Sequence, residues 1–500
     1  GYLAFISLVP WFISLSQISE IKKTAASGAL FGIIISLYFS LPLYQSISIS
    51  SPDNIIRPVL LLLFTAIAPN LIMYCLFSIL MRWIYDKPQH YHIFLPASLW
   101  ILLDYLKELS SIMIPWGFAG YTQVFSPFIQ FAEITGIHGI SFLIIMINSI
   151  IAEIIMIILN EFHYGNKTEK IESSYVLTNK LTFILSNKNF FIHLFLFCVV
   201  FTTFLLYGNV RKKFITNSLK NSAQIKYLIV QGNSESLERW NESTSSLRYQ
   251  TYIQLTNKKI NETDFTVWPE TVLNSSDKIN FEIMSGISTK LRDSGFFITG
   301  GIRRDNNGNN YNSIFIMNKN NLEYIYDKKI LFPYSERPFF GTTAGSFLNS
   351  PEKFTEGKSR DIFKTGDILT GYSICFESIY PSVIRKQARS GSSLLINVAN
   401  DSWFGDSSVP HLQQYAIIAR AIENRISIIR SANSGISFAV SPAGEIITEI
   451  PINTRDISYG ILPVIKERSF YTKSGNWFII ISILIILFTL AKNEIKQYPA

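Results

Sequence analysis

Long apolar runs alternate with short polar loops over roughly the first two hundred residues of the chain. Most of the runs approach or reach the ~20 residues that a helix needs to cross the hydrocarbon core of a bilayer. The pattern therefore predicts membrane-spanning helices, most of them before residue 208 and one near the end of the chain. The expected spans are residues 1–15, 28–45, 59–81, 93–106, 136–159, 190–207 and 477–491.

Residues 208–475 have a different pattern, in which short β-favouring runs are separated by polar stretches of helical length. The strand-like runs are 225–231, 265–268, 295–302, 311–317, 368–376, 394–399 and 436–441, and the helix-length stretches include 235–258, 278–293 and 410–424. Such alternation is typical of a layered α/β domain. We therefore expect a membrane bundle over 1–207, an extramembrane α/β domain over 208–475, and a closing helix with a short tail over 476–500.

Lysine and arginine are unevenly distributed among the loops of the predicted bundle. Every second loop carries them, as Lys22, Lys23, Arg82, Lys87, Lys167, Lys170, Lys180, Lys188, Lys492 and Lys496, whereas loops 46–57 and 108–135 contain only Arg57. Cytoplasmic loops are enriched in basic residues, so 208–475 is predicted to lie on the far side of the membrane. Arg211, Lys212 and Lys213 stand on the wrong side for this rule, which long translocated domains follow poorly.

The composition narrows the class of protein. The chain is 48% hydrophobic and only 16% charged, which is too apolar for an ordinary soluble protein. Its net charge of +8 does not indicate nucleic-acid binding, because many of the basic residues flank apolar runs. Six histidines without metal-ligand spacing predict neither a metal nor another cofactor, and three cysteines exclude a disulfide framework. We expect the start at Gly1 to be that of a fragment or trimmed chain.

Cys375 is the cysteine of the polar region, since Cys75 and Cys198 lie in apolar runs. It ends the strand-like run 368–376, and Glu377 follows two positions later, where strand alternation would place it on the same face. A thiol beside a carboxylate at the end of a buried strand is a candidate nucleophile. The alternative is a small buried core residue, because free cysteine is among the most buried residue types.

Two further charged residues close strand-like runs. Glu270 ends Trp268-Pro269-Glu270, where the proline stops the strand, and Lys328 follows Tyr326 and Asp327. Taken singly, each is more simply read as a surface residue. Together with Cys375 they resemble the site of the nitrilase superfamily, which has a glutamate, a lysine and a cysteine in this chain order.

The likeness is greatest to one family in that superfamily, apolipoprotein N-acyltransferase. The motifs that carry it are Trp-Pro-Glu at 268–270, Tyr-x-Lys with Leu-x-Pro-x-x-Glu at 326–336, Ile-Cys-x-Glu at 374–377, Asn-Asp-Ser-Trp-Phe-Gly at 400–405, Val-Gln-Gly-Asn at 230–233 with Trp240 after it, and Arg-Ser-Ala-Asn-Ser-Gly-Ile at 430–436. The resemblance implies a multi-pass α-helical membrane bundle with an extramembrane α/β nitrilase-like domain, built as a layered α-β-β-α sandwich.

The resemblance also implies an activity. An acyl chain would pass from a membrane phospholipid, through a thioester on Cys375, to the N-terminal amino group of a diacylated apolipoprotein. Glu270 would be the general base and Lys328 would stabilise the oxyanion. Supporting residues would be Glu336, Phe376 and Glu377, and substrate-binding residues Trp240, Asn312, Phe339, Phe340, Trp403 and Phe404. The resemblance further implies a monomer in the bacterial inner membrane, with its catalytic domain facing the periplasm and no nucleic-acid partner.

Some features depart from the family pattern. The family has eight spans against seven expected here, which fits loss of its first span, and Phe376 and Ser335 replace a usual tyrosine and glycine. Two other functions stay open: a membrane-tethered amidase that hydrolyses a C–N bond with the same three residues, and a non-catalytic lipoprotein-binding protein. Residues 339–366 have little periodic pattern and an apolar start, so we expect a lid that admits lipid.

Overall fold

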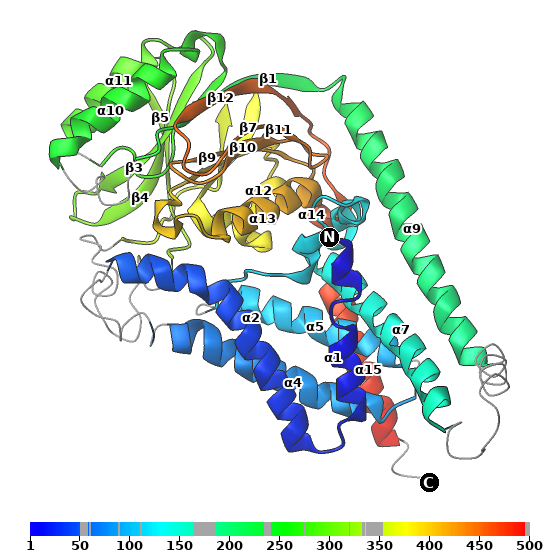
Figure 1. Ribbon diagram of the computed structural model, residues 1–500. Coiled ribbons are helices and arrows are strands. Elements are labelled where there is room, and N and C mark those ends of the chain that lie inside the picture. Colours follow the sequence, from blue (N-terminus) through cyan, green and yellow to red (C-terminus); the bar gives the residue numbers. More distant parts are fainter. Residues whose placement is uncertain are drawn as a thin grey trace.

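The computed structural model describes residues 1–50, 59, 62–88, 91–110, 113–164, 187–234, 242–274, 277–319, 321–332, 336 and 354–495. Two regions are evident in Figure 1, a group of long helices and a domain of two β-sheets with helices outside them. The long helix α9 leads from the helical region into the first strand, and the last helix returns from the domain to the helical region.

Each predicted span overlaps helical residues in the described part of the chain. The helices are α1 (Val9–Gln17), α2 (Ile21–Ser50), α4 (Ala68–Tyr85), α5 (Tyr91–Leu109), α7 (Ile137–Tyr164), α9 (Lys188–Leu219) and α15 (Trp477–Ile495). Within the described residues, four helical segments are long and apolar enough to cross a membrane: Ile21–Phe39, Ala68–Tyr85, Ile137–Asn160 and Lys188–Leu219. Tyr2–Gln17 and Trp477–Lys492 are apolar but shorter. The predicted fold class of this region, a helical membrane bundle, is confirmed.

Several ionisable side chains inside the bundle are paired with one another. His92 Nδ1 lies 2.7 Å from a carboxylate oxygen of Glu153. Lys107 Nζ lies 3.6 Å from Asp104 and donates to the Tyr74 hydroxyl at 3.3 Å. Ionisable groups at membrane depth are costly unless they face the bundle interior and find partners, and these do both.

The domain consists of two six-stranded sheets packed face to face. One sheet has the order β12-β1-β2-β3-β4-β5 and the other β11-β10-β9-β8-β7-β6. The first contains β1 (Ala223–Gln231), β2 (Phe265–Val267), β3 (Phe296–Arg304), β4 (Asn310–Met317), β5 (Leu322–Asp327) and β12 (Asp456–Val464). The second contains β6 (Ile362–Thr365), β7 (Ile368–Ile374), β8 (Leu394–Ala399), β9 (Ser427–Ala432), β10 (Ser437–Val440) and β11 (Ile446–Ile450).

Helices cover the outer face of each sheet, which completes the predicted α-β-β-α sandwich (Figure 1). α10 (Glu242–Thr256) and α11 (Asp277–Ser288) cover the first sheet, and α12 (Pro381–Arg389) and α13 (Val409–Asn424) the second. Alternate residues of β1 point to opposite faces, so that Tyr227 and Ile229 enter the core between the sheets while Leu228 and Val230 pack toward α10 and α11. Because both faces are buried, these strands read as continuous apolar runs.

The prediction of strands in residues 208–475 was incomplete. All seven strand-like runs contain strands, but β5, β6, β9, β11 and β12 were not predicted, and neither was α12.

The bundle and the domain are tied together by buried polar contacts. Glu423 of α13 accepts a hydrogen bond from the backbone N–H of Ile137 at 2.6 Å, and Arg425 donates to Glu133 at 2.8 Å. The backbone N–H of Ser382 donates to Glu108 of α5 at 3.1 Å. These contacts hold the sandwich in one position on the bundle.

Candidate active site

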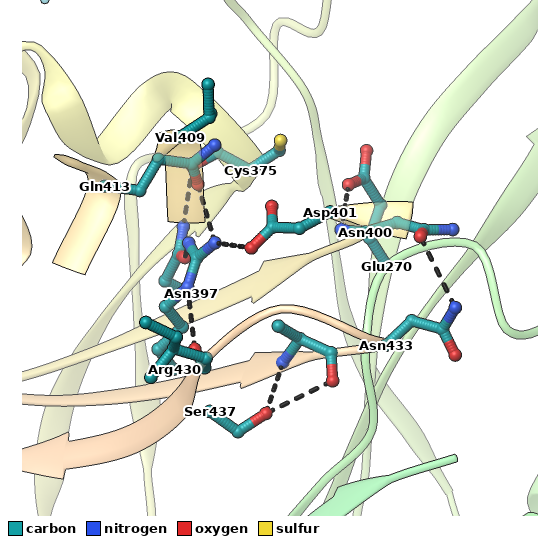
Figure 2. Close-up of polar contacts among 12 residues, drawn as sticks. Glu270, Cys375, Asn397, Asn400, Asp401, Val409, Gln413, Arg430, Asn433 and Ser437 are labelled. Atoms are coloured by element: carbon teal, nitrogen blue, oxygen red, sulfur yellow. Dashed lines mark hydrogen bonds and ion pairs between the residues drawn. The ribbon is translucent and has the colours of Figure 1, made fainter. Parts of the chain in front are cut away.

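Glu270 and Cys375 both follow the carboxyl ends of parallel strands, Glu270 after β2 and Cys375 after β7. The sheets pack so that these ends meet, and the Glu270 backbone N–H contacts the Ala399 carbonyl of β8 at 3.4 Å. In Figure 2 the sulfur of Cys375 and the carboxylate of Glu270 point toward the same space. This edge is where layered α/β domains usually carry their sites.

Cys375 does not lie on the strand, contrary to the prediction. β7 ends at Ile374, and Cys375 begins the 3₁₀ helix η8 (Cys375–Ile379) with φ of 53°. A positive φ in a non-glycine residue is strained and persists only when its surroundings impose it. Here the Cys375 carbonyl accepts hydrogen bonds from Asn397 Nδ2 at 3.1 Å and Ser378 Oγ at 3.0 Å. The turn therefore presents the thiol at the tip of a sharp bend.

Glu377 consequently does not share a strand face with Cys375. Its carboxylate turns back and accepts from the backbone N–H groups of Ile374 at 2.7 Å, Lys329 at 2.7 Å and Ile330 at 3.0 Å. It also accepts from the Tyr326 hydroxyl at 3.1 Å. The side chain is completely buried. Glu377 thus joins the turn that carries the thiol to the segment that carries Lys328.

Lys328 lies between two carboxylates. Its Nζ is 3.4 Å from Glu270 and 2.8 Å from Glu336, and its side chain is 2% exposed. Asn312 Nδ2 donates to the same two carboxylates, at 2.7 Å to Glu270 and 3.0 Å to Glu336. The other oxygen of Glu270 accepts from the backbone N–H of Asn400 at 2.9 Å. Glu270 therefore accepts hydrogen bonds from three donors, and Asn312 and Lys328 donate to the same oxygen.

The electrostatics of the site fix two protonation states. Burial raises the pKa of the Cys375 thiol well above its usual value, and the Glu270 carboxylate raises it further, against a smaller lowering by Lys328. Burial alone would lower the pKa of Lys328, but the carboxylates of Glu336 and Glu270 outweigh burial and raise it. The resting site at neutral pH thus holds a protonated thiol and a charged ammonium. A thiol in this state would need a base in order to act as a nucleophile.

A second buried polar network lies behind Cys375 (Figure 2). Arg430 of β9 donates to Asp401 at 2.7 Å and to Gln413 at 2.6 Å, and it also donates to Asn397. Asn397 in turn holds the Cys375 carbonyl. The motifs 400–405 and 430–436 were noted in the sequence, but no role was predicted for Arg430 or Asp401. A completely buried arginine on a central strand is the signal that marks such a network.

The predicted supporting and substrate-binding residues are placed as follows. The Phe376 ring is buried against Phe332 at 4.9 Å between centroids, with Lys328 Nζ 5.6 Å above it. Phe404 is buried too, 6.2 Å from the Trp116 ring of the bundle, and Trp403 is half-buried. Trp240, Phe339 and Phe340, with the apolar start of the predicted lid, lie outside the described residues.

No three His, Cys, Asp or Glu side chains gather closely enough to hold a metal ion in the part of the chain that the structure describes.

The sequence matches two family models, which cover the two regions of the structure. Residues 1–150 match the apolipoprotein N-acyltransferase N-terminal domain, and residues 229–466 match the carbon-nitrogen hydrolase family. The chain belongs to the apolipoprotein N-acyltransferase family. Apolipoprotein N-acyltransferases similar to this chain span both regions together.

Three such relatives show the extent of the similarity. The enzyme of Rickettsia prowazekii is 26% identical over 81% of this chain and 77% of its own length. That of Geobacter metallireducens is 27% identical over 76% and 70%. That of Wigglesworthia glossinidia brevipalpis is 25% identical over 93% and 89%. The family assignment therefore rests on the bundle as well as on the sandwich.

Proposed function

We propose that this acyltransferase moves an acyl chain from a membrane phospholipid to the free N-terminal amino group of diacylglyceryl-cysteine in apolipoproteins. The observation that carries the proposal is a buried thiol at the tip of a strained turn, facing a carboxylate that is itself 3.4 Å from a buried ammonium. The position of this site, on a sandwich fixed to an apolar bundle, favours an acyl donor that resides in a membrane.

In the first half-reaction Glu270 takes the thiol proton as the Cys375 sulfur attacks the ester carbonyl of the phospholipid. The carbonyl oxygen becomes an oxyanion, which the Lys328 ammonium stabilises. When the tetrahedral intermediate collapses, the C–O bond breaks and Glu270 returns the proton to the departing alkoxide. The products are a lyso-phospholipid and an acyl thioester on Cys375.

In the second half-reaction the amino group of the apolipoprotein attacks the thioester, and Glu270 takes a proton from the nitrogen. Lys328 stabilises the second oxyanion. Collapse breaks the C–S bond, forms the amide, and the Cys375 sulfur regains a proton from Glu270. Atoms and protons balance in each step, and the protein returns to its starting state.

The same proposal places the chain in a bacterial inner membrane, as a monomer with residues 208–475 in the periplasm and no nucleic-acid partner. The unequal distribution of basic residues between the loops supports this orientation. α15 then returns the chain through the membrane, so that its last residues are cytoplasmic.

The test is to incubate the purified protein with phospholipid and to follow both products separately. We expect one burst of lyso-phospholipid equal to the amount of enzyme, with the acyl group on Cys375 by mass spectrometry. Turnover should then require a diacylglyceryl-cysteinyl peptide. Steady release of free fatty acid without the peptide would favour a hydrolase, and no acyl group on Cys375 would favour a non-catalytic lipoprotein-binding protein. Cys198→Ala, which removes an exposed thiol of α9, is the matched control.

A further inference from the structure

A groove opens where the outer end of α9 passes the turn between β10 and β11. Its volume is about 260 Å³. The lining residues are Asn209, Lys212, Lys213, Thr216, Asn217 and Glu445. Those on α9 recur at the spacing of one helix face. None of them belongs to the group around Cys375, so the groove is separate from the candidate active site.

The length of α9 places this groove at the level of lipid headgroups. The 32 residues of α9 extend for ~48 Å at 1.5 Å per residue, whereas the hydrocarbon core is ~30 Å thick. About 20 residues from Lys188 cross the core, and the next turns lie in the headgroup region. The large apolar side chains of Leu206, Val210 and Phe214, four residues apart, are 59%, 68% and 58% exposed. Lipid contact on that side therefore continues beside Lys212 and Lys213.

The groove has fixed walls. Ile215 and Leu219 of α9 pack against Ala443 of the β10–β11 turn. One turn earlier, Arg211 is bound to Glu133 of the bundle through two nitrogens, one of them at 2.9 Å from a carboxylate oxygen. The helix is thus held against the turn on one side of the opening and against the bundle on the other.

The charges in the groove are of both signs. Arg211 is paired with Glu133, whereas the side chains of Lys212 and Lys213 are exposed, with Lys212 Nζ 3.9 Å from Glu445. Glu445 also accepts from the Thr216 hydroxyl at 3.2 Å and keeps 38% of its side chain exposed. Two ammonium groups on the non-cytoplasmic side run against the usual distribution of basic residues. Two lysines against one glutamate leave the groove with a net positive charge, which suits an anionic partner.

We propose that this groove binds the headgroup of an outer-leaflet phospholipid that carries both a phosphate and an ammonium group. Lys212 and Lys213 contact the phosphate, and Glu445 accepts from the ammonium. The lipid so bound is a fixed neighbour of α9, at a place separate from the residues around Cys375. This proposal depends on α9 crossing the membrane and not on the acyl-transfer reaction. Different experiments therefore test the lipid site and the proposed function.

The test measures binding of short-chain phosphatidylethanolamine and phosphatidylglycerol to the full-length protein in detergent, by native mass spectrometry. For Lys212→Ala with Lys213→Ala, we expect about thirtyfold weaker binding of both lipids, because each basic residue near a phosphate surface contributes about fivefold. Lys220→Ala is the matched control, since Lys220 is an exposed lysine that caps α9 outside the groove. It should bind like the wild type.

Glu445→Gln separates the two halves of the proposal. It should lose the preference for phosphatidylethanolamine over phosphatidylglycerol while it still binds both. Equal binding by the wild type and the double lysine variant would overturn the site. An unchanged headgroup preference in Glu445→Gln would overturn the ammonium assignment. Inorganic phosphate that displaces the lipid at equal concentration would show a free-phosphate site and overturn the lipid assignment.

Discussion

Replacing Glu270 by glutamine tests the assignment of the general base with little change of shape. Glu270 now accepts from Asn312 at 2.7 Å, from Asn400 at 2.9 Å and from Lys328 at 3.4 Å. An amide keeps one acceptor oxygen but turns an N–H₂ group toward one of these donors. Lys328 keeps Glu336 at 2.8 Å as its counter-ion, so the buried ammonium stays paired and the domain should still fold.

The size of the effect follows from the state of the thiol. A free cysteine is a few per cent thiolate at pH 7, and Cys375 has less because burial and the Glu270 carboxylate raise its pKa. The variant has no carboxylate to take the proton, and burial, the larger cause of the raised pKa, still keeps its thiolate fraction small. Loss of a general base costs about 10²–10⁴-fold, or about 3–5 kcal/mol in activation free energy. We expect acylation of Cys375 to slow by that amount.

The pH dependence has a definite sign. Because the pKa of the thiol is raised in the folded protein, Cys375 is still protonated at pH 7 to 9. Acylation of a variant that depends on preformed thiolate should therefore become about tenfold faster per pH unit over that range. The wild type should respond less, since its proton leaves during attack.

The assay is the single-turnover rate of acyl-Cys375 formation from labelled phospholipid, read by intact-protein mass spectrometry at several pH values. Glu262→Gln is the matched control, because Glu262 is an exposed carboxylate paired with Lys259 at 3.0 Å. Acylation of Glu270→Gln at the wild-type rate would refute the reasoning and require another base.

Three further predictions concern the nucleophile, its support and the topology. Cys375→Ser should abolish release of lyso-phospholipid, because a hydroxyl is far harder to deprotonate than a thiol, while Cys198→Ala should leave it unchanged; residual turnover by the serine variant would exclude the thioester. Glu377→Gln should lose two of the four buried hydrogen bonds of Glu377 and about 3–6 kcal/mol of unfolding free energy. Urea unfolding in detergent measures this loss, and an unchanged midpoint would contradict the role of Glu377 in joining the Cys375 turn to the Lys328 segment. A reporter fused after Ala500 should be active only in the cytoplasm, and protease added to spheroplasts should cut within 340–365; the reverse pattern would invert the topology.

Apolar strands in the middle of a sheet could be predicted from the sequence, and edge strands could not. β8 was predicted over its full length, Leu394–Ala399, because both of its faces are buried and every residue but Asn397 is apolar. β12 contains Gly460 and Pro463, which argue against a strand. It lies at the edge of its sheet, where it pairs with β1 alone, so the missing proline N–H costs little. β9 was missed because Arg430 looks like a surface residue until its partners from other elements are known.

The site was predictable in its residue types but not in its geometry. The order glutamate, lysine, cysteine and the strand ends could be read along the chain, because each motif is local. The positive φ of Cys375 depends on Asn397 of the neighbouring strand, which no local pattern reveals. Asn312 was predicted to bind substrate, but its amide nitrogen donates to Glu270 and Glu336. Its part in substrate binding stays a prediction.

In the proposed mechanism, the second carboxylate beside Lys328 allows one buried site to move a proton twice in each cycle. At rest the two carboxylates and the ammonium carry a net charge of −1, held by Asn312 and the Asn400 N–H. When Glu270 takes the thiol proton it becomes neutral, and the negative charge passes to the sulfur and then to the oxyanion. Glu336, 2.8 Å from Lys328, keeps the ammonium paired and charged throughout. The net charge of the site is therefore unchanged at every step. No additional buried charge has to be created, and creating one would be the main electrostatic cost in an interior of low dielectric.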